Sequence, residues 1–224
     1  MKVIITGTTG MVGHAVLIEA LEDDGIKEVL IINRKPLGIT HSKLVEILHK
    51  DFSDFSAIED KLSGYDGCYY CMGVSSSGMS EEQYTHITYD FTYALASVLY
   101  KQSPQATFIY VSGDGSDSSE QGKVMWARVK GKTENMVLKM GFKDAYAFRA
   151  GAILPTKGVK SKTKLYHIMY LILTPFNPLL RRLNSITTSE RLGKAMLSLT
   201  KNPQNEKIVY NRDINLIALR YINI

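Results

Sequence analysis

Apolar runs and amphipathic stretches alternate along most of the chain. The first run, 2–6, is rich in β-branched residues, and an apolar-periodic stretch follows it over 11–22. The same alternation predicts strands over 2–6, 28–33, 44–48, 67–72, 107–111 and 145–149, and helices over 11–22, 53–62, 80–101 and 121–140. Strands that alternate with helices in this way predict an α/β fold, a doubly wound parallel sheet with helices on both faces.

This alternation ends at Pro155. A basic loop with Lys157, Lys160, Lys162 and Lys164 leads into an apolar and aromatic stretch over 165–183. A helix over 189–200, a strand over 207–210 and a short helix over 214–220 are predicted after it. We predict one domain over 1–155 and a small C-terminal appendage over 156–224 that packs on it and covers its cleft. The stretch 165–183 is expected to cover the domain or a second subunit, with a membrane surface as the alternative.

The turn after the first strand, TGTTGMVG over 6–13, carries the clearest chemical pattern. Gly7, Gly10 and Gly13 suit three tasks: a tight turn, close approach of the backbone to a phosphate, and close packing of helix on strand. The free N–H groups and the positive end of the helix dipole favour a pyrophosphate. A tight turn without a ligand is the alternative. The position between a strand and a helix favours a dinucleotide site.

The end of the second strand indicates which dinucleotide fits. An acidic residue there would accept hydrogen bonds from both ribose hydroxyls and favour NAD. The stretch NRKP over 33–36 instead holds Arg34 and Lys35 and no carboxylate, which suits a 2′-phosphate. We predict NADP as the cofactor, with NAD as second choice. A solvated basic loop is the alternative interpretation.

Ligands in open parallel sheets lie beyond the carboxyl ends of the strands. At these ends Asp51 could accept from an adenine amino group, and Gly73 lets the chain pass close beneath a cofactor. Substrate contacts are expected from 73–80, from 113–121 and from the region after Pro155. The serine- and glycine-rich loop over 113–119 is expected to be flexible and exposed. The candidate cofactor-binding residues are Gly7, Thr9, Gly10, Met11, Val12, Gly13, Arg34, Lys35, Asp51, Phe52, Cys71, Met72, Gly73, Lys130 and Ile153.

This set of residues resembles the short-chain dehydrogenase/reductase superfamily. The likeness rests on the TGxxGxxG opening, on CMG at 71–73, on VS at 111–112 and on FRAG at 148–151, and it covers residues 2–155 best. The sequence looks most like the atypical, epimerase-like branch that includes NmrA-like and Tat-interacting-protein-like members. The resemblance implies a Rossmann fold and an NAD(P) cofactor.

The resemblance also implies catalytic residues. In active members a serine ends the fifth strand, and a Tyr-x-x-x-Lys pair lies on the following helix. Ser112 and Lys130 match this pattern, but Trp126 occupies the tyrosine position, and an indole cannot move a proton near neutral pH. Tyr84, Tyr89 or Ser112 with a relayed water are conceivable substitutes. Two functions stay open: an NADP-dependent oxidoreductase or nucleotide-sugar-epimerase-like enzyme, and a non-catalytic NADP(H)-sensing protein.

Composition and charge limit which kinds of ligand and partner we expect for this protein. The chain has 224 residues, is 45% hydrophobic and 22% charged, and has a net charge of +5, which suits an anionic ligand and also plain solubility. The first strand begins at Lys2, so we expect no signal peptide, and no apolar stretch reaches the ~18 residues of a membrane span. Basic residues show no nucleic-acid module. We expect a small-molecule substrate, no nucleic-acid or membrane partner, and a homodimer as an option.

Cysteine and histidine positions indicate compartment and metal content. Cys68 and Cys71 lie three apart in a predicted strand and so point to opposite faces, which disfavours a disulfide or shared metal ligation. This favours a reducing, cytoplasmic location. The five histidines are scattered without ligand spacing, so no metal site is predicted.

Overall fold

The computed structural model describes residues 1–159 and 183–221. Its main sheet has seven parallel strands in the order β3-β2-β1-β4-β5-β6-β9. These are β1 (Lys2–Thr6), β2 (Glu28–Asn33), β3 (Leu44–Leu48), β4 (Gly67–Tyr70), β5 (Thr107–Gly113), β6 (Asp144–Ala150) and β9 (Ile208–Tyr210). Two further strands, β7 (Ala152–Leu154) and β8 (Ile186–Thr188), pair in parallel beside it. The predicted doubly wound parallel sheet is confirmed.

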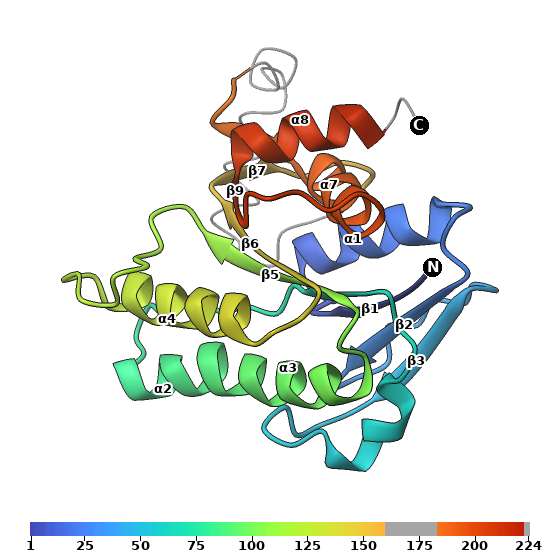
Figure 1. The fold of residues 1–224 in the computed structure, drawn as a ribbon, viewed down its shortest axis with the longest axis horizontal. Coiled ribbons are helices and arrows are strands. Elements are labelled where there is room, and N and C mark those ends of the chain that lie inside the picture. The colour runs from blue at the N-terminus through green and yellow to red at the C-terminus, as the bar shows by residue number, and fades with distance from the viewer. Residues whose placement is uncertain (160–182, 222–224) are drawn as a thin grey trace.

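Helices cover both faces of this sheet (Figure 1). The helical elements are α1 (Met11–Glu22), η1 (Ser56–Leu62), α2 (Glu81–Thr85), η2 (His86–Asp90), α3 (Phe91–Gln102), α4 (Met125–Lys139), α7 (Ser189–Lys201) and α8 (Asn211–Tyr221). One face packs against α1, α7 and α8 through a core that includes Val16, Leu192 and Ile214. The other packs against η1, α3 and α4, with Leu95 and Val137 in its core. Strands buried on both faces explain the continuous apolar runs in the sequence.

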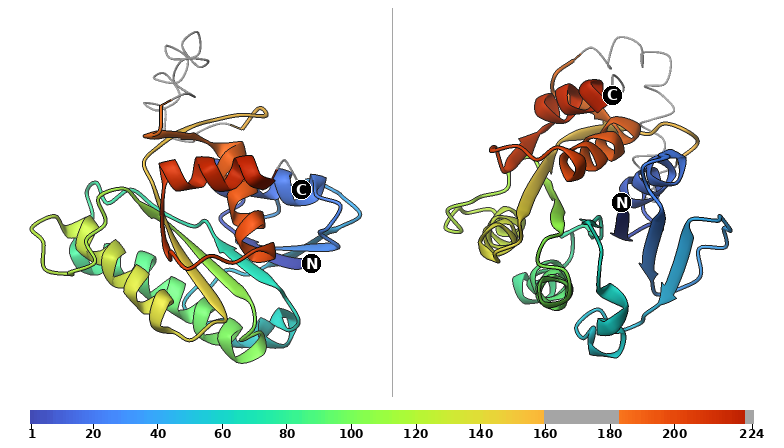
Figure 2. Two further views of the ribbon diagram at one scale, coloured as in Figure 1. Left: turned by 45° about the horizontal axis from the view of Figure 1, so that its top comes forward. Right: turned by 45° about the vertical axis from the view of Figure 1, so that its right-hand side comes forward.

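The C-terminal part contributes to the same layers. Strand β9 extends the sheet beside β6, and α7 packs on α1 above it (Figure 2). The basic residues Lys160, Lys162 and Lys164, and the stretch 165–182, lie outside the described residues. No helix in the described chain is long and apolar enough to cross a membrane.

The predicted strand over 67–72 ends earlier than expected, at Tyr70. The chain leaves the sheet at Cys71 because it passes directly over the glycine turn: a methyl group on Gly7 would lie 2.6 Å from the carbonyl oxygen of Cys71. Cys68 packs into the core on the α3 side, whereas Cys71 packs against the α1 side. Both cysteines are free, as their predicted opposite orientation requires.

Two predicted helices also differ in detail. The helix over 53–62 is a 3₁₀ helix that starts at Ser56, because the Asp51 and Asp54 carboxylates accept hydrogen bonds from the N–H groups of Ser53 and Ser56 and hold turns there. The helix over 80–101 runs as α2, η2 and α3, with one π-helical turn, η2, in its middle.

The loop over 113–119 is only partly exposed, contrary to the expectation. Ser116 is buried, and its Oγ lies 2.8 Å from the Oγ of Ser112. The N–H of Asp117 donates to the carbonyl oxygen of Ala127, which ties the loop to the first turn of α4. The loop is therefore packed against the helix that follows it.

Candidate functional site

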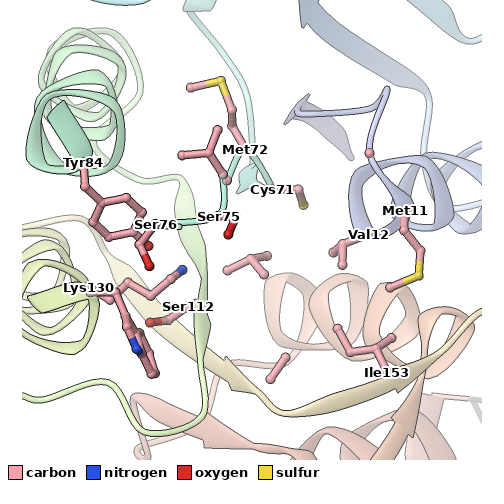
Figure 3. Close-up of a pocket in the computed structure, with 16 residues that line it drawn as sticks. Met11, Val12, Cys71, Met72, Ser75, Ser76, Tyr84, Ser112, Lys130 and Ile153 are labelled. Atoms are coloured by element: carbon pink, nitrogen blue, oxygen red, sulfur yellow. The ribbon is translucent and has the colours of Figure 1, made fainter. Parts of the chain in front are cut away.

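The main cleft lies where the strand order reverses. Strands β1 and β4 are neighbours, and the chain continues from them to opposite edges of the sheet, so their carboxyl ends diverge. A cavity of about 610 Å³ opens beyond these ends and beyond β5 and β6 (Figure 3). It is lined by Gly10, Met11, Val12, Cys71, Met72, Gly73, Val74, Ser75, Ser76, Tyr84, Val111, Ser112, Trp126, Lys130, Ala150 and Ile153.

The glycine turn forms one wall of this cavity. Gly7 has φ +71°, and a side chain on Gly13 would collide with the carbonyl of Gly7, so both positions need glycine for the close approach of helix and strand. Gly10 caps α1 without a side-chain hydrogen bond, and the first turn of α1 holds no acidic residue. The N-terminal amides of α1 are therefore left without an anionic side chain, which fits a bound diphosphate.

A second cavity, of about 460 Å³, continues past the ends of β1 and β2. It is lined by Gly7, Thr9, Ile32, Asn33, Arg34, Lys35, Phe52 and Met72, and Met72 lines both cavities. Arg34 and Lys35 are exposed and form no ion pair with any residue in the described ranges. Two cations without an ion-pair partner among the described residues thus lie at the far end of a cleft that begins at the glycine turn. The described residues fit an NAD(P) cofactor.

A hydrogen-bonded chain holds the basic loop in place. The Thr8 hydroxyl donates to Asn33 Oδ1 at 2.9 Å, and Asn33 Nδ2 donates to Glu46 Oε1 at 2.9 Å. The same oxygen of Glu46 accepts from the N–H of Leu37 at 3.0 Å. A carboxylate from β3 therefore braces the loop. Sequence analysis missed it because Glu46 comes next to β2 only through the pairing of Ile31 with Glu46.

Most predicted cofactor-binding residues line one of these two cavities; Gly13 and Asp51 do not. Gly13 serves the helix–strand contact described above. Asp51 is exposed, and its carboxylate accepts from the N–H and the hydroxyl of Ser53. These hydrogen bonds lower the pKa of Asp51, the side-chain bond from Ser53 contributing most.

The two predicted catalytic residues meet at the inner end of the main cavity. Ser112 is 6% exposed at the end of β5, and Lys130 reaches in from α4 with its Nζ 5.5 Å from the centre of the Tyr110 ring. Burial lowers the pKa of Lys130 to about 8, although the Glu134 carboxylate opposes this shift. The Trp126 ring packs on the loop, within 3.8 Å of where a methyl group on Gly113 would lie.

Comparison with known proteins identifies the family. The family model described as "NAD dependent epimerase/dehydratase family" matches residues 3–209. The chain belongs to this family. The predicted likeness to atypical short-chain dehydrogenases/reductases is thereby confirmed. The family also places the chain among NAD(P)-binding proteins of the oxidoreductase or epimerase type.

Individual relatives are distant. Protein FMP52-1, mitochondrial, of Scheffersomyces stipitis is 25% identical over 181 residues, covering 78% of this chain and 79% of that protein. Protein HTATIP2 of Rattus norvegicus is 24% identical over 156 residues, covering 68% of this chain and 63% of that protein. The crystal structure of the Bordetella bronchiseptica enzyme WbmH in complex with NAD⁺ has a TM-score of 0.65 at 16% identity, covering 93% of this chain and 74% of that one. This last similarity shows the fold alone.

The described part of the cleft is built without a metal site and without residues 183–221. No group of three or more histidine, cysteine, aspartate or glutamate side chains in residues 1–159 and 183–221 could hold a metal ion. None of the described residues that line the main cavity comes from 183–221. The substrate end of the cleft is built, in the described part, by β4, β5, α2 and α4 with their loops.

Proposed function

We propose that this protein binds NADP(H) and is an oxidoreductase acting on a carbonyl or alcohol group of a small molecule. The observation that supports it best is one cavity that joins the N-terminal turn of α1 to Ser112 and Lys130. A bound nicotinamide ring would supply or accept a hydride there. The Ser112 hydroxyl would hold the substrate oxygen, and the Lys130 ammonium would bind ribose hydroxyls and stabilise negative charge on that oxygen.

The preference for NADP rests on the second cavity. Arg34 and Lys35 line it without carboxylate partners among the described residues, and a guanidinium there can form charge-assisted hydrogen bonds with a 2′-phosphate. The Glu46 carboxylate is engaged by Asn33 and by the N–H of Leu37, so it faces the loop that it braces.

Trp126 itself provides the test. It is the single tryptophan of the chain and lines the main cavity, so its fluorescence should transfer to a reduced nicotinamide bound there. We expect titration with NADPH to give a dissociation constant below the millimolar range and tighter than that of NADH. Absence of energy transfer from Trp126 to either nucleotide up to millimolar concentration would contradict the cofactor assignment.

The second candidate function is an NADP(H)-sensing protein without turnover. It is favoured by Trp126, which offers no proton at the position where active relatives of the superfamily carry tyrosine. Two assays separate the candidates: consumption of NADPH with a panel of aldehydes and ketones, and conversion of sugar nucleotides to their epimers, which leaves the amount of cofactor unchanged. Turnover that disappears in Lys130→Ala supports the enzyme, whether reductase or epimerase-like, whereas tight binding without turnover supports the sensor.

A further inference from the structure

Few side chains of the main cavity can release a proton. Among the described residues that line it, the titratable ones are Cys71, Tyr84 and Lys130. Burial raises the pKa of the Cys71 thiol, and Cys71 lies on the glycine-turn side of the cavity. Tyr84 and Lys130 lie together on the opposite side, next to Ser112 (Figure 3).

We propose that Tyr84, on α2, donates the proton to the substrate oxygen. The inference rests on the proposed oxidoreductase function and deepens it. The acid would come from the helical run that packs beside α4, rather than from α4 itself. Trp126 would then only line the site, and its position would not need to supply a proton.

The placement of Tyr84 is fixed by contacts at the start of α2. The Ser80 side chain accepts from the N–H of Gln83, and the Gln83 side chain accepts from the N–H of Ser80, which closes a capping box. Glu81 then pairs with Arg128 of α4, with 2.7 Å between Oε2 and Nη2. Because Arg128 lies two residues before Lys130, this ion pair sets the position of α2 relative to the helix that carries Lys130.

The π-helical turn η2 separates Tyr84 from the outward-facing tyrosines of the same helical run. Tyr84 is 2% exposed, whereas Tyr93 on α3 is 50% exposed and stacks on Tyr89. A π turn adds a residue to the helix and so shifts the faces on its two sides relative to one another. The phenol of Tyr84 is turned into the cavity, and burial raises its pKa, which keeps it protonated at neutral pH as an acid must be.

The proposed carbonyl reduction needs no reagent other than the reduced cofactor and the Tyr84 proton. In carbonyl reduction the carbonyl carbon receives the hydride from the reduced cofactor, and the oxygen takes the proton from the Tyr84 hydroxyl as the C=O double bond becomes single. The products are the alcohol, the oxidised cofactor and a tyrosinate. The Lys130 ammonium stabilises this tyrosinate until solvent returns the proton.

The first test compares Tyr84→Phe with Tyr93→Phe, which removes an exposed hydroxyl of the same helical run. We expect Tyr84→Phe to lower kcat by about 10²–10⁴-fold while the NADPH dissociation constant stays within about twofold of wild type, and Tyr93→Phe to change neither. In the Tyr84→Phe background, Trp126→Tyr should restore part of the turnover by placing a phenol one helical turn from Lys130. A kcat of Tyr84→Phe equal to that of wild type overturns the proposal.

A second readout needs no turnover. 3-Fluorotyrosine is placed at position 84 or, as control, at position 93, and the ¹⁹F resonance is followed with pH and with NADP⁺. We expect saturating NADP⁺ to shift the resonance at 84 but not at 93. With Lys130 present, the resonance at 84 should also shift as Lys130 loses its proton near pH 8, and Lys130→Met should abolish this shift because it removes the charge that titrates beside the phenol. A resonance at 84 that bound NADP⁺ leaves unchanged, or the same pH dependence near pH 8 with and without Lys130→Met, overturns the role of Tyr84. Failure of NADPH to bind in the Trp126 titration overturns the proposed function instead.

Discussion

The Arg149 guanidinium, at the end of β6, holds the Glu134 carboxylate of α4 with three hydrogen bonds, the shortest of 2.6 Å between Nη2 and Oε2. Glu134 is fully buried, and Arg149 is 8% exposed. The hydrogen bonds that Arg149 donates to Glu134 raise the pKa of Arg149. Since Glu134 lies one turn after Lys130, the ion pair fixes the helix that carries Lys130 against the sheet.

Removal of one partner of this pair leaves a buried charge without compensation. We expect Glu134→Ala to lower the free energy of unfolding by about 3–5 kcal/mol, measured by urea denaturation. Glu206→Ala, at an exposed carboxylate with no ion pair among the described residues, is the control and should stay within about 0.5 kcal/mol of wild type. Equal stability of the two variants would show that the pair contributes nothing.

Gly7 and Gly64 both have positive φ, +71° and +77°, but only Gly7 has neighbours where a side chain would lie. Gly64→Ala should cost about 1–2 kcal/mol, the left-handed strain of an L-residue. Gly7→Ala adds a collision with the backbone of Cys71, so we expect a larger loss of stability together with loss of NADPH binding. Thermal unfolding and the Trp126 titration measure the two effects. A Gly7→Ala protein as stable as Gly64→Ala would contradict this packing.

The basic residues Arg34 and Lys35 predict a preference for NADPH over NADH, which a substitution of Arg34 should reduce. Arg34→Ala should weaken NADPH binding by about 10–100-fold, the loss of one or more hydrogen bonds to a charged group, and leave NADH binding nearly unchanged. Arg220→Ala, at an exposed arginine on α8, provides the matched control. Equal losses for NADPH and NADH in Arg34→Ala would refute the 2′-phosphate contact.

Lys130 should lose its proton at a lower pH than an ordinary lysine does. With its pKa lowered to about 8, it becomes a neutral, nucleophilic amine above that pH. Acylation measured by mass spectrometry should therefore rise at Lys130 from pH 7 to pH 9, and bound NADPH should suppress it. The exposed Lys139 on the same helix is the reference. The same titration profile at both lysines would exclude a desolvated Lys130.

The lowered pKa of Lys130 also determines how the stability of the folded protein changes with pH. The unfolded chain holds the Lys130 proton up to about pH 10.4, whereas the folded chain loses it near 8. Between these values the unfolded state binds more protons, so the Lys130 contribution to stability rises with pH. Lys130→Met removes the buried charge, and its stability should change less with pH in this window than that of wild type. A parallel pH dependence in both proteins would contradict the burial of the charge.

Several expectations stay predictions. They include the cytoplasmic location, the absence of nucleic-acid and membrane partners, the homodimer, and the covering of the cleft by 156–224. The NADP preference and the roles of Ser112 and Lys130 are tested by the experiments above.

Local sequence patterns were sufficient to predict the sheet, the glycine turn and the family. Strands buried on both faces need continuous apolar runs, and a helix that packs this closely on a strand needs glycine at Gly7 and Gly13, so both requirements can be read from local sequence. The contacts between residues far apart in the sequence could be seen only in the folded protein. Strand pairing brings Glu46 to the basic loop, and the packing of α2 on α4 brings Tyr84 to Lys130. Such contacts depend on the register of strand pairing and on the packing of helices, and no local sequence pattern encodes these.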